Sequence, residues 1–229
     1  MAAPVYRIVS IGALSAHPLW EERGDVRTGH ATTTLIVAGE MKLLVNPGLP
    51  GQALLARMGE RTRVKPGEIT HVFLTTFTVE HYRSLPLFEN AQWLVHEPER
   101  DAARRALDEQ LTRAKESRDQ DLVGTVQQHV DLLDRCRDAP DKLADNVDLF
   151  PLPGLSPGTC GVLMPLPSST VLVCGDAIPT QEHLEEGKVL PTCMDVEQAQ
   201  ESFREAIEIA DLLVPGRDNI TANPVRQLM

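Results

Sequence analysis

The pattern of apolar positions in the first part of the chain consists of short runs rich in β-branched residues. Such runs, bounded by turn residues, are typical of strands that are buried in a sheet. Two of the runs flank a tight turn at residues 38–40, which predicts an antiparallel hairpin. The predicted strands cover residues 6–12, 31–37, 41–45, 69–74 and 92–95.

Helical spacing of apolar residues replaces this pattern in three segments. The first covers residues 52–62 and ends before a turn at Pro66 and Gly67. The longest covers residues 97–135, and we expect Gly124 to divide it into two helices. The last covers residues 195–211 and has an apolar stripe along one face.

Between the second and third helical segments the pattern becomes strand-like again, and a short final strand follows. These strands cover residues 147–154, 160–166, 169–176 and 212–214. The order of elements predicts an α/β layered sandwich with two mixed sheets between helices. We expect a single domain over residues 1–229, with residues 97–135 as a helical insert. The insert either forms a partner-binding or homodimer surface or covers one face of its own sandwich.

Composition narrows the classes of partner. The 229 residues contain 22 Lys and Arg against 33 Asp and Glu, a formal net charge of −11. An acidic surface repels phosphate groups, which argues against nucleic acid and anionic membranes as partners. No apolar run approaches the roughly 18 residues of a membrane-spanning helix, and the N-terminal segment does not resemble a secretory signal. We expect a soluble, cytoplasmic protein whose four irregularly spaced cysteines are reduced.

Five loop segments that follow predicted strands carry the candidate chemistry, since strand-end loops commonly build functional sites. In this order and at this spacing they resemble the metallo-β-lactamase superfamily, which includes glyoxalase II-type and other zinc hydrolases. The resemblance extends from Thr32 to Asn219 and implies an αββα four-layer sandwich. The segments are NPGLP at 46–50, LTTFTVEH at 74–81, PLPGLSPGT at 151–159, CGDAIP at 174–179 and PGRDN at 215–219.

The segment 74–81 resembles the superfamily's first metal-ligand signature, Thr-His-x-His-x-Asp-His, but lacks most of its ligands. Thr76 and Thr78 stand where the resemblance implies two zinc-binding histidines. Glu80 replaces the aspartate, and His81 keeps the last histidine. A threonine hydroxyl is a poor zinc ligand, because zinc favours imidazole, thiolate and carboxylate groups.

The same loss of ligands recurs in the other loops. Leu155 takes the place of the histidine that the resemblance implies in a Pro-Gly-His-Thr-Pro-Gly turn, and Asn46 replaces an early aspartate. Asp176 keeps the position of the aspartate that bridges two metals. Arg217 takes the place of the last histidine, and a guanidinium is always protonated. We predict that Arg217 replaces the metal electrostatically by pairing with Asp176 or Glu80, so no metal cofactor is expected.

The leading functional interpretation is therefore a metallo-β-lactamase-fold pseudoenzyme with a degenerate metal site. It lacks the dinuclear zinc centre and acts as a binding or regulatory module instead of a zinc hydrolase. A small-molecule ligand is expected in the residual pocket. The predicted binding residues are Thr76, Thr78, Glu80, Leu155 and Arg217.

Two catalytic alternatives stay open at this stage. The first is a hydrolase with zinc or another divalent metal in a mononuclear site on Glu80, His81 and Asp176, completed by His183 or His96. The second is metal-free acid/base catalysis by His81 with Asp176. Against both, Glu80 and His81 are interpreted as relics that cap the following helix.

For several other residues we favour a structural role over a catalytic or metal-binding one. Ser156 and Cys174 are formal nucleophile candidates, but one lies in a Pro-Gly turn and the other in an apolar strand. His96 is expected to make a local hydrogen bond, and Glu97 to help begin a helix. His183 is expected on a mobile acidic loop. The histidines without clustered partners, to which no role is assigned, are His17, His30, His71 and His129.

Overall fold

The first sheet of the sandwich has six strands in the order β1-β2-β3-β4-β5-β6. The computed structural model describes residues 3–226. The hairpin β2–β3 is antiparallel, as predicted, and β3 to β6 run parallel. The strands are β1 Val5–Ser10, β2 Thr33–Ala38, β3 Met41–Val45, β4 His71–Leu74, β5 Gln92–Val95 and β6 Arg137–Asp138.

The second sheet also has six strands, in the order β12-β11-β10-β9-β8-β7. Its strands are antiparallel except for the parallel pair β10 and β11. The short strands β6, β7 and β12 have no signal in the apolar pattern, because two or three residues show no alternation. The strands are β7 Lys142–Ala144, β8 Val147–Pro151, β9 Cys160–Pro165, β10 Thr170–Gly175, β11 Leu212–Pro215 and β12 Thr221–Ala222.

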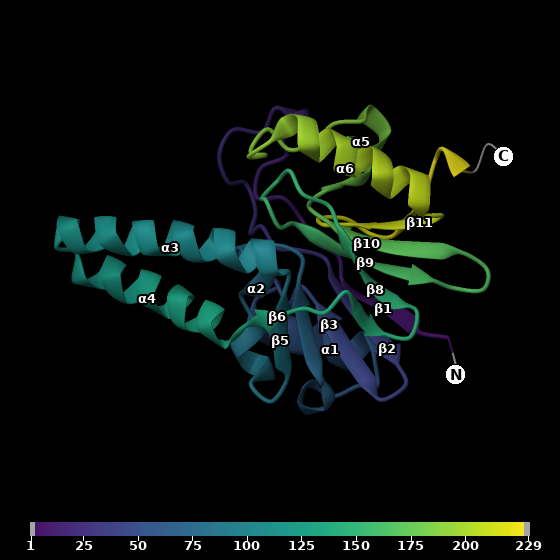
Figure 1. Cartoon of the computed structure of the whole chain (residues 1–229), viewed down its shortest axis with the longest axis horizontal. Coiled ribbons are helices and arrows are strands. Elements are labelled where there is room, and N and C mark those ends of the chain that lie inside the picture. The colour runs from purple at the N-terminus through teal and green to yellow at the C-terminus, as the bar shows by residue number, and fades with distance from the viewer. Residues whose placement is uncertain (1–2, 227–229) are drawn as a thin grey trace.

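Helices cover the outer face of each sheet, so the fold has four layers (Figure 1). The first sheet packs against α1, α3 and α4, and the second packs against α5 and α6. The helices are α1 Gly51–Arg61, α2 Val79–Tyr82, α3 Glu97–Ser117, α4 Gln120–Arg135, α5 Gln181–Glu186 and α6 Val196–Ile209. Short 3₁₀ turns lie at Pro18–Trp20, Pro66–Glu68 and Leu85–Phe88.

Three separate apolar cores hold these layers together. In β4, Val72 and Leu74 belong to the core beneath the helices, whereas Phe73 belongs to the core between the sheets. In β10, Val173 faces the other sheet and Leu172 faces α6. This period-two alternation within uniformly apolar strands is what buries both faces of each sheet. The predicted αββα sandwich is confirmed.

The long helical segment folds as a hairpin of α3 and α4 that extends from the sandwich (Figure 1). The predicted break at Gly124 is wrong, because Gly124 lies within α4. The chain turns at Arg118, whose φ is 58°, and the Asp119 carboxylate caps α4 by accepting the N–H groups of Asp121 and Leu122. A capping side chain decides a helix start more strongly than one exposed glycine, which costs a helix only about 1 kcal/mol. The homodimer expected through this hairpin stays a prediction.

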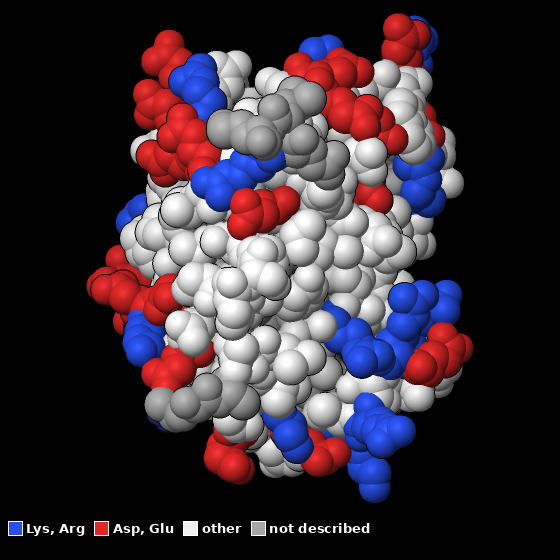
Figure 2. Space-filling view, turned by 90° about the vertical axis from the view of Figure 1, so that its right-hand side faces the viewer, with Lys and Arg blue, Asp and Glu red and all other residues white. Residues whose placement is uncertain are grey.

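Charged side chains on the face opposite the hairpin surround a broad area of uncharged residues (Figure 2). Basic side chains at the lower right of that view are interrupted by acidic ones, so this face has no continuous basic surface. None of the helices within residues 3–226 has the length and apolar character needed to cross a membrane.

The topology brings the candidate loops to one edge of the sandwich. The parallel strands β3, β4 and β5 end there in the first sheet, and β10 and β11 end there in the second. Two backbone hydrogen bonds join the sheets at this edge: the N–H of Thr32 donates to the carbonyl of Gly216 at 2.7 Å, and that of Cys160 to Thr75 at 3.0 Å. Side chains from five loops are therefore held within one small volume.

Two leucines of α4 test whether the hairpin is part of the core. Leu133 is fully buried, whereas Leu122 is 45% exposed on the same helix. Leu133→Ala should lower the free energy of unfolding by about 2–5 kcal/mol, because it leaves a cavity. Leu122→Ala should change it by less than about 1 kcal/mol. Urea denaturation measures both, and equal effects would contradict the packing described.

Candidate functional site

An arginine–carboxylate pair lies at the centre of the site, where the carboxyl ends of β10 and β11 meet. Arg217 donates from Nε to Oδ1 of Asp176 at 2.8 Å and from Nη2 to Oδ2 at 2.6 Å. Its Nη1 donates to Oε2 of Glu80, which comes from α2 in the other half of the sandwich. The ion pair predicted for Arg217 is confirmed, and it includes both acidic residues.

Glycine is required on both strands next to this pair. Gly175 has a φ of +56°, and a Cβ atom there would lie 2.5 Å from Oγ1 of Thr75. A Cβ atom at Gly216 would lie 2.2 Å from Oδ1 of Asp176. The Gly-Asp and Gly-Arg dipeptides therefore give the backbone both the turn and the space that the ion pair needs.

Both members of the central pair are charged although both are buried. Asp176 is 4% exposed and Arg217 is 7% exposed. Burial alone would raise the pKa of Asp176, but the charge and hydrogen bonds of Arg217, together with the nearby His81 and His183, outweigh burial and lower the pKa to about 2. Burial opposes the charge of Arg217 too, yet Asp176 holds its pKa above the usual range. Each charge therefore compensates the other, and neither side chain would be stable in this buried position alone.

His81 lies behind Asp176 and is fully buried. Its Nδ1 shares a hydrogen bond of 2.7 Å with the hydroxyl of Thr78, and its Nε2 is 3.5 Å from Oδ2 of Asp176. Burial lowers the pKa of His81 to about 4, so the imidazole is neutral at pH 7. Neither Glu80 nor His81 caps α2 through its side chain, so the predicted capping role is wrong. Their carboxylate and imidazole take part in the site instead.

The donor set does not fit a dinuclear zinc centre. The hydroxyls of Thr76 and Thr78 and the alkyl chain of Leu155 replace imidazoles, and the Arg217 guanidinium stands between the carboxylates that would otherwise face a cation. Within residues 3–226, no three His, Cys, Asp or Glu side chains are grouped so that they could hold a metal ion.

Asn46, at the position of the early aspartate, clamps the neighbouring strand. Its Nδ2 donates to the Thr75 hydroxyl at 2.9 Å, and its Oδ1 accepts the Thr75 backbone N–H at 2.9 Å. Both residues are buried. The amide thus satisfies the end of β4 with two hydrogen bonds, one as donor and one as acceptor.

A cavity of about 630 Å³ opens in front of the ion pair. Thr76, Thr78, Glu80, Leu155 and Arg217, the five predicted binding residues, all line it. His81 is absent from the described residues that line it. The hydroxyl of Thr76 is buried and has no hydrogen-bond partner within residues 3–226.

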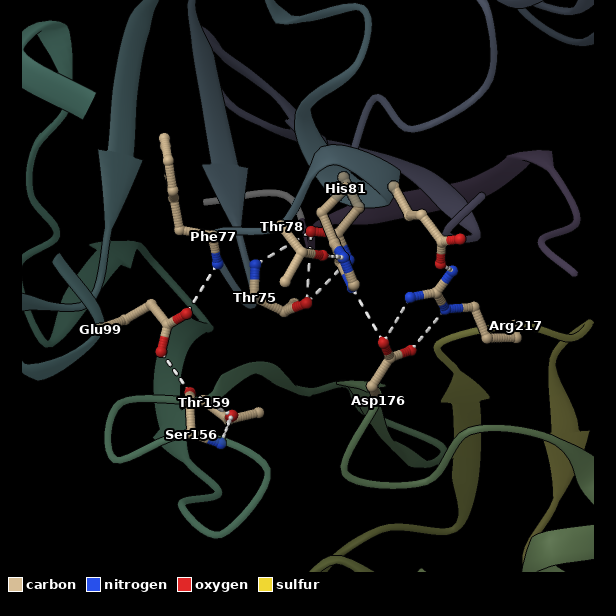
Figure 3. A network of polar contacts seen from close by, with 11 residues as sticks. Thr75, Phe77, Thr78, His81, Glu99, Ser156, Thr159, Asp176 and Arg217 are labelled. Atoms are coloured by element: carbon tan, nitrogen blue, oxygen red, sulfur yellow. Dashed lines mark hydrogen bonds and ion pairs between the residues drawn. The ribbon is translucent and has the colours of Figure 1, made fainter. Parts of the chain in front are cut away.

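The far end of the cavity contains a buried carboxylate that the sequence interpretation missed. Glu99 of α3 accepts the backbone N–H of Phe77 at 2.7 Å on one oxygen and contacts the hydroxyl of Ser156 with the other. Ser156 in turn lies 2.7 Å from the Thr159 hydroxyl (Figure 3). Burial raises the pKa of Glu99. One sequence feature could have identified Glu99. It is the third residue of a predicted helix, a position at which a side-chain acceptor is favourable.

A second polar cluster lies behind Arg217 and corrects the expectation for His183. This histidine is fully buried on α5, so the predicted mobile loop is wrong. Thr180 caps α5 and binds both Nδ1 of His183, at 2.9 Å, and Nε2 of His17, at 3.2 Å. His17 had no expected role, because its partner is 163 residues away along the chain.

The remaining candidates have structural roles. His96 shares a hydrogen bond of 3.0 Å through its Nδ1 with the carbonyl of Gly158, which lies 62 residues away along the chain, so the expected local hydrogen bond is wrong. Cys174 is fully buried in β10, and burial raises the pKa of its thiol. A protonated, inaccessible thiol is not a nucleophile.

Comparison with known proteins assigns the chain to a family. The metallo-β-lactamase superfamily profile matches residues 26–216, and the chain belongs to this superfamily. The match ends one residue before Arg217. A search of curated protein sequences finds no match.

Solved structures of similar fold include a dizinc lactonase. A metallo-β-lactamase candidate from Thermotoga maritima has a TM-score of 0.69 at 17% identity, covering 96% of this chain and all of its own (100%). AidC, a dizinc quorum-quenching lactonase in complex with its product N-hexanoyl-L-homoserine, has a TM-score of 0.61 at 14% identity, covering 90% and 80% of the two chains. AiiA of B. thuringiensis, a variant with N-decanoyl-L-homoserine at its active site, has a TM-score of 0.62 at 17% identity, covering 91% and 89%.

Removing the central cation should unfold the site. Arg217→Met leaves Asp176 buried without a partner, which should lower the free energy of unfolding by about 3–5 kcal/mol at pH 7. The matched variant Arg217→Met with Asp176→Asn should recover part of this loss. Urea denaturation measures both. No difference between the single and double variants would contradict the charge argument.

The decrease in the free energy of unfolding caused by Arg217→Met should depend on pH. In the native protein the pKa of Asp176 is about 2, below the roughly 3.9 of an unfolded chain. Its contribution to stability is therefore complete above about pH 4 and is lost as the pH falls toward 2. In Arg217→Met the buried carboxyl should have a raised pKa, so ionising it at higher pH costs stability. The two proteins should differ more at pH 7 than at pH 3, and a constant difference would contradict this.

Proposed function

We propose that this member of the superfamily binds a small molecule in its active-site cavity without a dinuclear zinc centre and acts as a binding or regulatory module. The observation that carries the proposal is the Arg217 guanidinium, which contacts Asp176 and Glu80 at once. Three side chains satisfy one another there with opposite charges. A divalent cation would have to displace a buried arginine and then find the ligands that Thr76 and Leu155 do not supply.

The cavity supports a binding role independently of metal chemistry. Its volume of about 630 Å³ lies in the range of small-molecule sites, about 300–1,000 Å³. Apolar side chains from α3 and from two loops form its walls, and polar groups lie at the ion pair and around Glu99. In AidC and AiiA, the proteins of similar fold, an N-acyl-homoserine is bound. An occupant that combines a polar head with an apolar chain fits these walls.

The alternative is a hydrolase with a mononuclear metal on Glu80, His81 and Asp176. The observation that favours it is that these three side chains are kept and lie together, within a superfamily that includes a dizinc lactonase among its similar structures. Metal-free acid/base catalysis by His81 is less well supported, because the imidazole is fully buried and does not line the cavity.

Metal analysis distinguishes the proposal from this alternative. Purified protein should contain far less than one metal ion per chain, and zinc should not raise its melting temperature. Arg217→His removes the cation and adds an imidazole beside Glu80, His81 and Asp176, so zinc should stabilise this variant. Arg217→Lys, which keeps a positive charge, is the matched control and should not respond. Stoichiometric zinc, iron or manganese that is lost in Asp176→Asn would favour the alternative.

Ligand binding tests the cavity directly. The uncharged probe N-phenyl-1-naphthylamine should bind the native protein and gain fluorescence. Ala106→Trp fills the cavity from α3 and should weaken this binding at least about tenfold, because the added ring takes the probe's place. Gln110→Trp lies exposed on the same helix and does not line the cavity, so it should bind as the native protein does. Equal binding by all three proteins would contradict the proposal.

A further inference from the structure

The charges that line the cavity are unbalanced toward acid. One basic residue, Arg217, faces three acidic residues, Glu80, Glu99 and Asp176. Arg217 is already engaged by two of them. The arginine therefore does not make this an anion-binding site: an added carboxylate or phosphate would enter a volume in which negative groups outnumber the one cation.

Hydrogen bonds identify which carboxylate is free to receive a ligand. Both oxygens of Asp176 accept from Arg217. One oxygen of Glu99 accepts the N–H of Phe77 and the other contacts Ser156. Glu80 contacts Arg217 through Oε2, and its Oε1 accepts no hydrogen bond from residues 3–226. The Glu80 side chain is 31% exposed and lines the cavity, whereas Asp176 and Glu99 are buried, so Glu80 is the carboxylate that a ligand can approach.

A second unused acceptor also lines the cavity. Oγ1 of Thr76 is buried, lines the cavity and has no hydrogen-bond partner within residues 3–226. Buried hydroxyls in native proteins are nearly always paired. A ligand head that donates several hydrogen bonds would satisfy this hydroxyl oxygen together with Glu80.

The rest of the lining fits an apolar chain. The walls come from α3, from the loop before the Pro18–Trp20 turn and from the loop before α6 (Figure 1). Leu155, the residue at a histidine position of the superfamily, adds to the apolar surface near the ion pair. The apolar lining residues are Leu14, Ala16, Pro18, Phe77, Leu190 and Met194, together with three alanines of α3.

We propose that the cavity binds a primary amine with an apolar chain, its ammonium group on Glu80 and its chain along α3. An ammonium carries three donors and one positive charge, so it matches the free Glu80 oxygen and the Thr76 hydroxyl and offsets the excess of acid. This inference rests on the proposed binding function and names the class of ligand.

Three probes of equal chain length test the class of ligand by isothermal titration calorimetry at pH 7. They are decylamine, 1-decanol and decanoate, each kept below the concentration at which it aggregates. Decylamine should bind about tenfold more tightly than decanol, the gain of a hydrogen bond to a charged group. Decanoate should bind more weakly than decanol. Ala106→Trp should reduce the binding of all three.

Glu80→Gln isolates the proposed contact. The amide oxygen can still accept from Arg217, whose pair with Asp176 is untouched, so the variant should fold, and its binding of amine and alcohol is compared within the same protein. Its preference for decylamine over decanol should disappear. Glu97→Gln, an exposed residue of α3 that does not line the cavity, removes the same charge and should keep the preference.

The outcomes separate the two levels of the proposal. Equal binding of amine and alcohol, preference for decanoate, or an unchanged preference in Glu80→Gln would overturn the amine inference and leave the binding function standing. Failure of all three probes and of N-phenyl-1-naphthylamine to bind would overturn both.

Discussion

The bidentate pair between Arg217 and Asp176, extended to Glu80, is the interaction on which the site depends. It joins the ends of two neighbouring strands of one sheet to α2 in the other half of the sandwich. A buried carboxylate needs a cation, and in most of this superfamily's chemistry that cation is a metal. Here the cation is covalently part of the chain. The chain itself therefore supplies the positive charge that balances the buried carboxylates, which supports the proposed binding role.

Most polar groups around the pair are satisfied by one another. Asn46 clamps Thr75, His81 is held by Thr78, and Glu99 joins α3 to two loops. Such a network holds its members rigidly and leaves few groups for chemistry. Nε2 of His81 also has no hydrogen-bond partner within residues 3–226, but His81 does not line the cavity. Thr76, whose hydroxyl is unpaired, and Glu80, whose Oε1 is unused, do line it, and this supports the proposed binding role.

The fold was largely predictable because its signals are local. Apolar runs of strand length, helical stripes and turn residues predict most elements of the sandwich within a few residues. The apolar pattern gave wrong predictions where a structure is decided by a single capping side chain or by packing against a distant part of the chain. It divided the long helical segment at Gly124, whereas the Asp119 cap decides the break. It assigned a mobile loop to residues that α5 buries against the second sheet.

The sequence by itself determined which metal-ligand positions are lost and that an arginine replaces one of them next to the retained acidic residues. These are residue types at fixed positions, so they can be read without a structure. The pairing of Arg217 with both Asp176 and Glu80 was decided by the tertiary structure, because it depends on how two sheets bring residues 137 positions apart into contact. The same holds for Glu99 with Ser156 and for His17 with Thr180. Hydrogen-bonding capacity is a property of a residue type, but whether that capacity is used depends on neighbours that folding alone supplies.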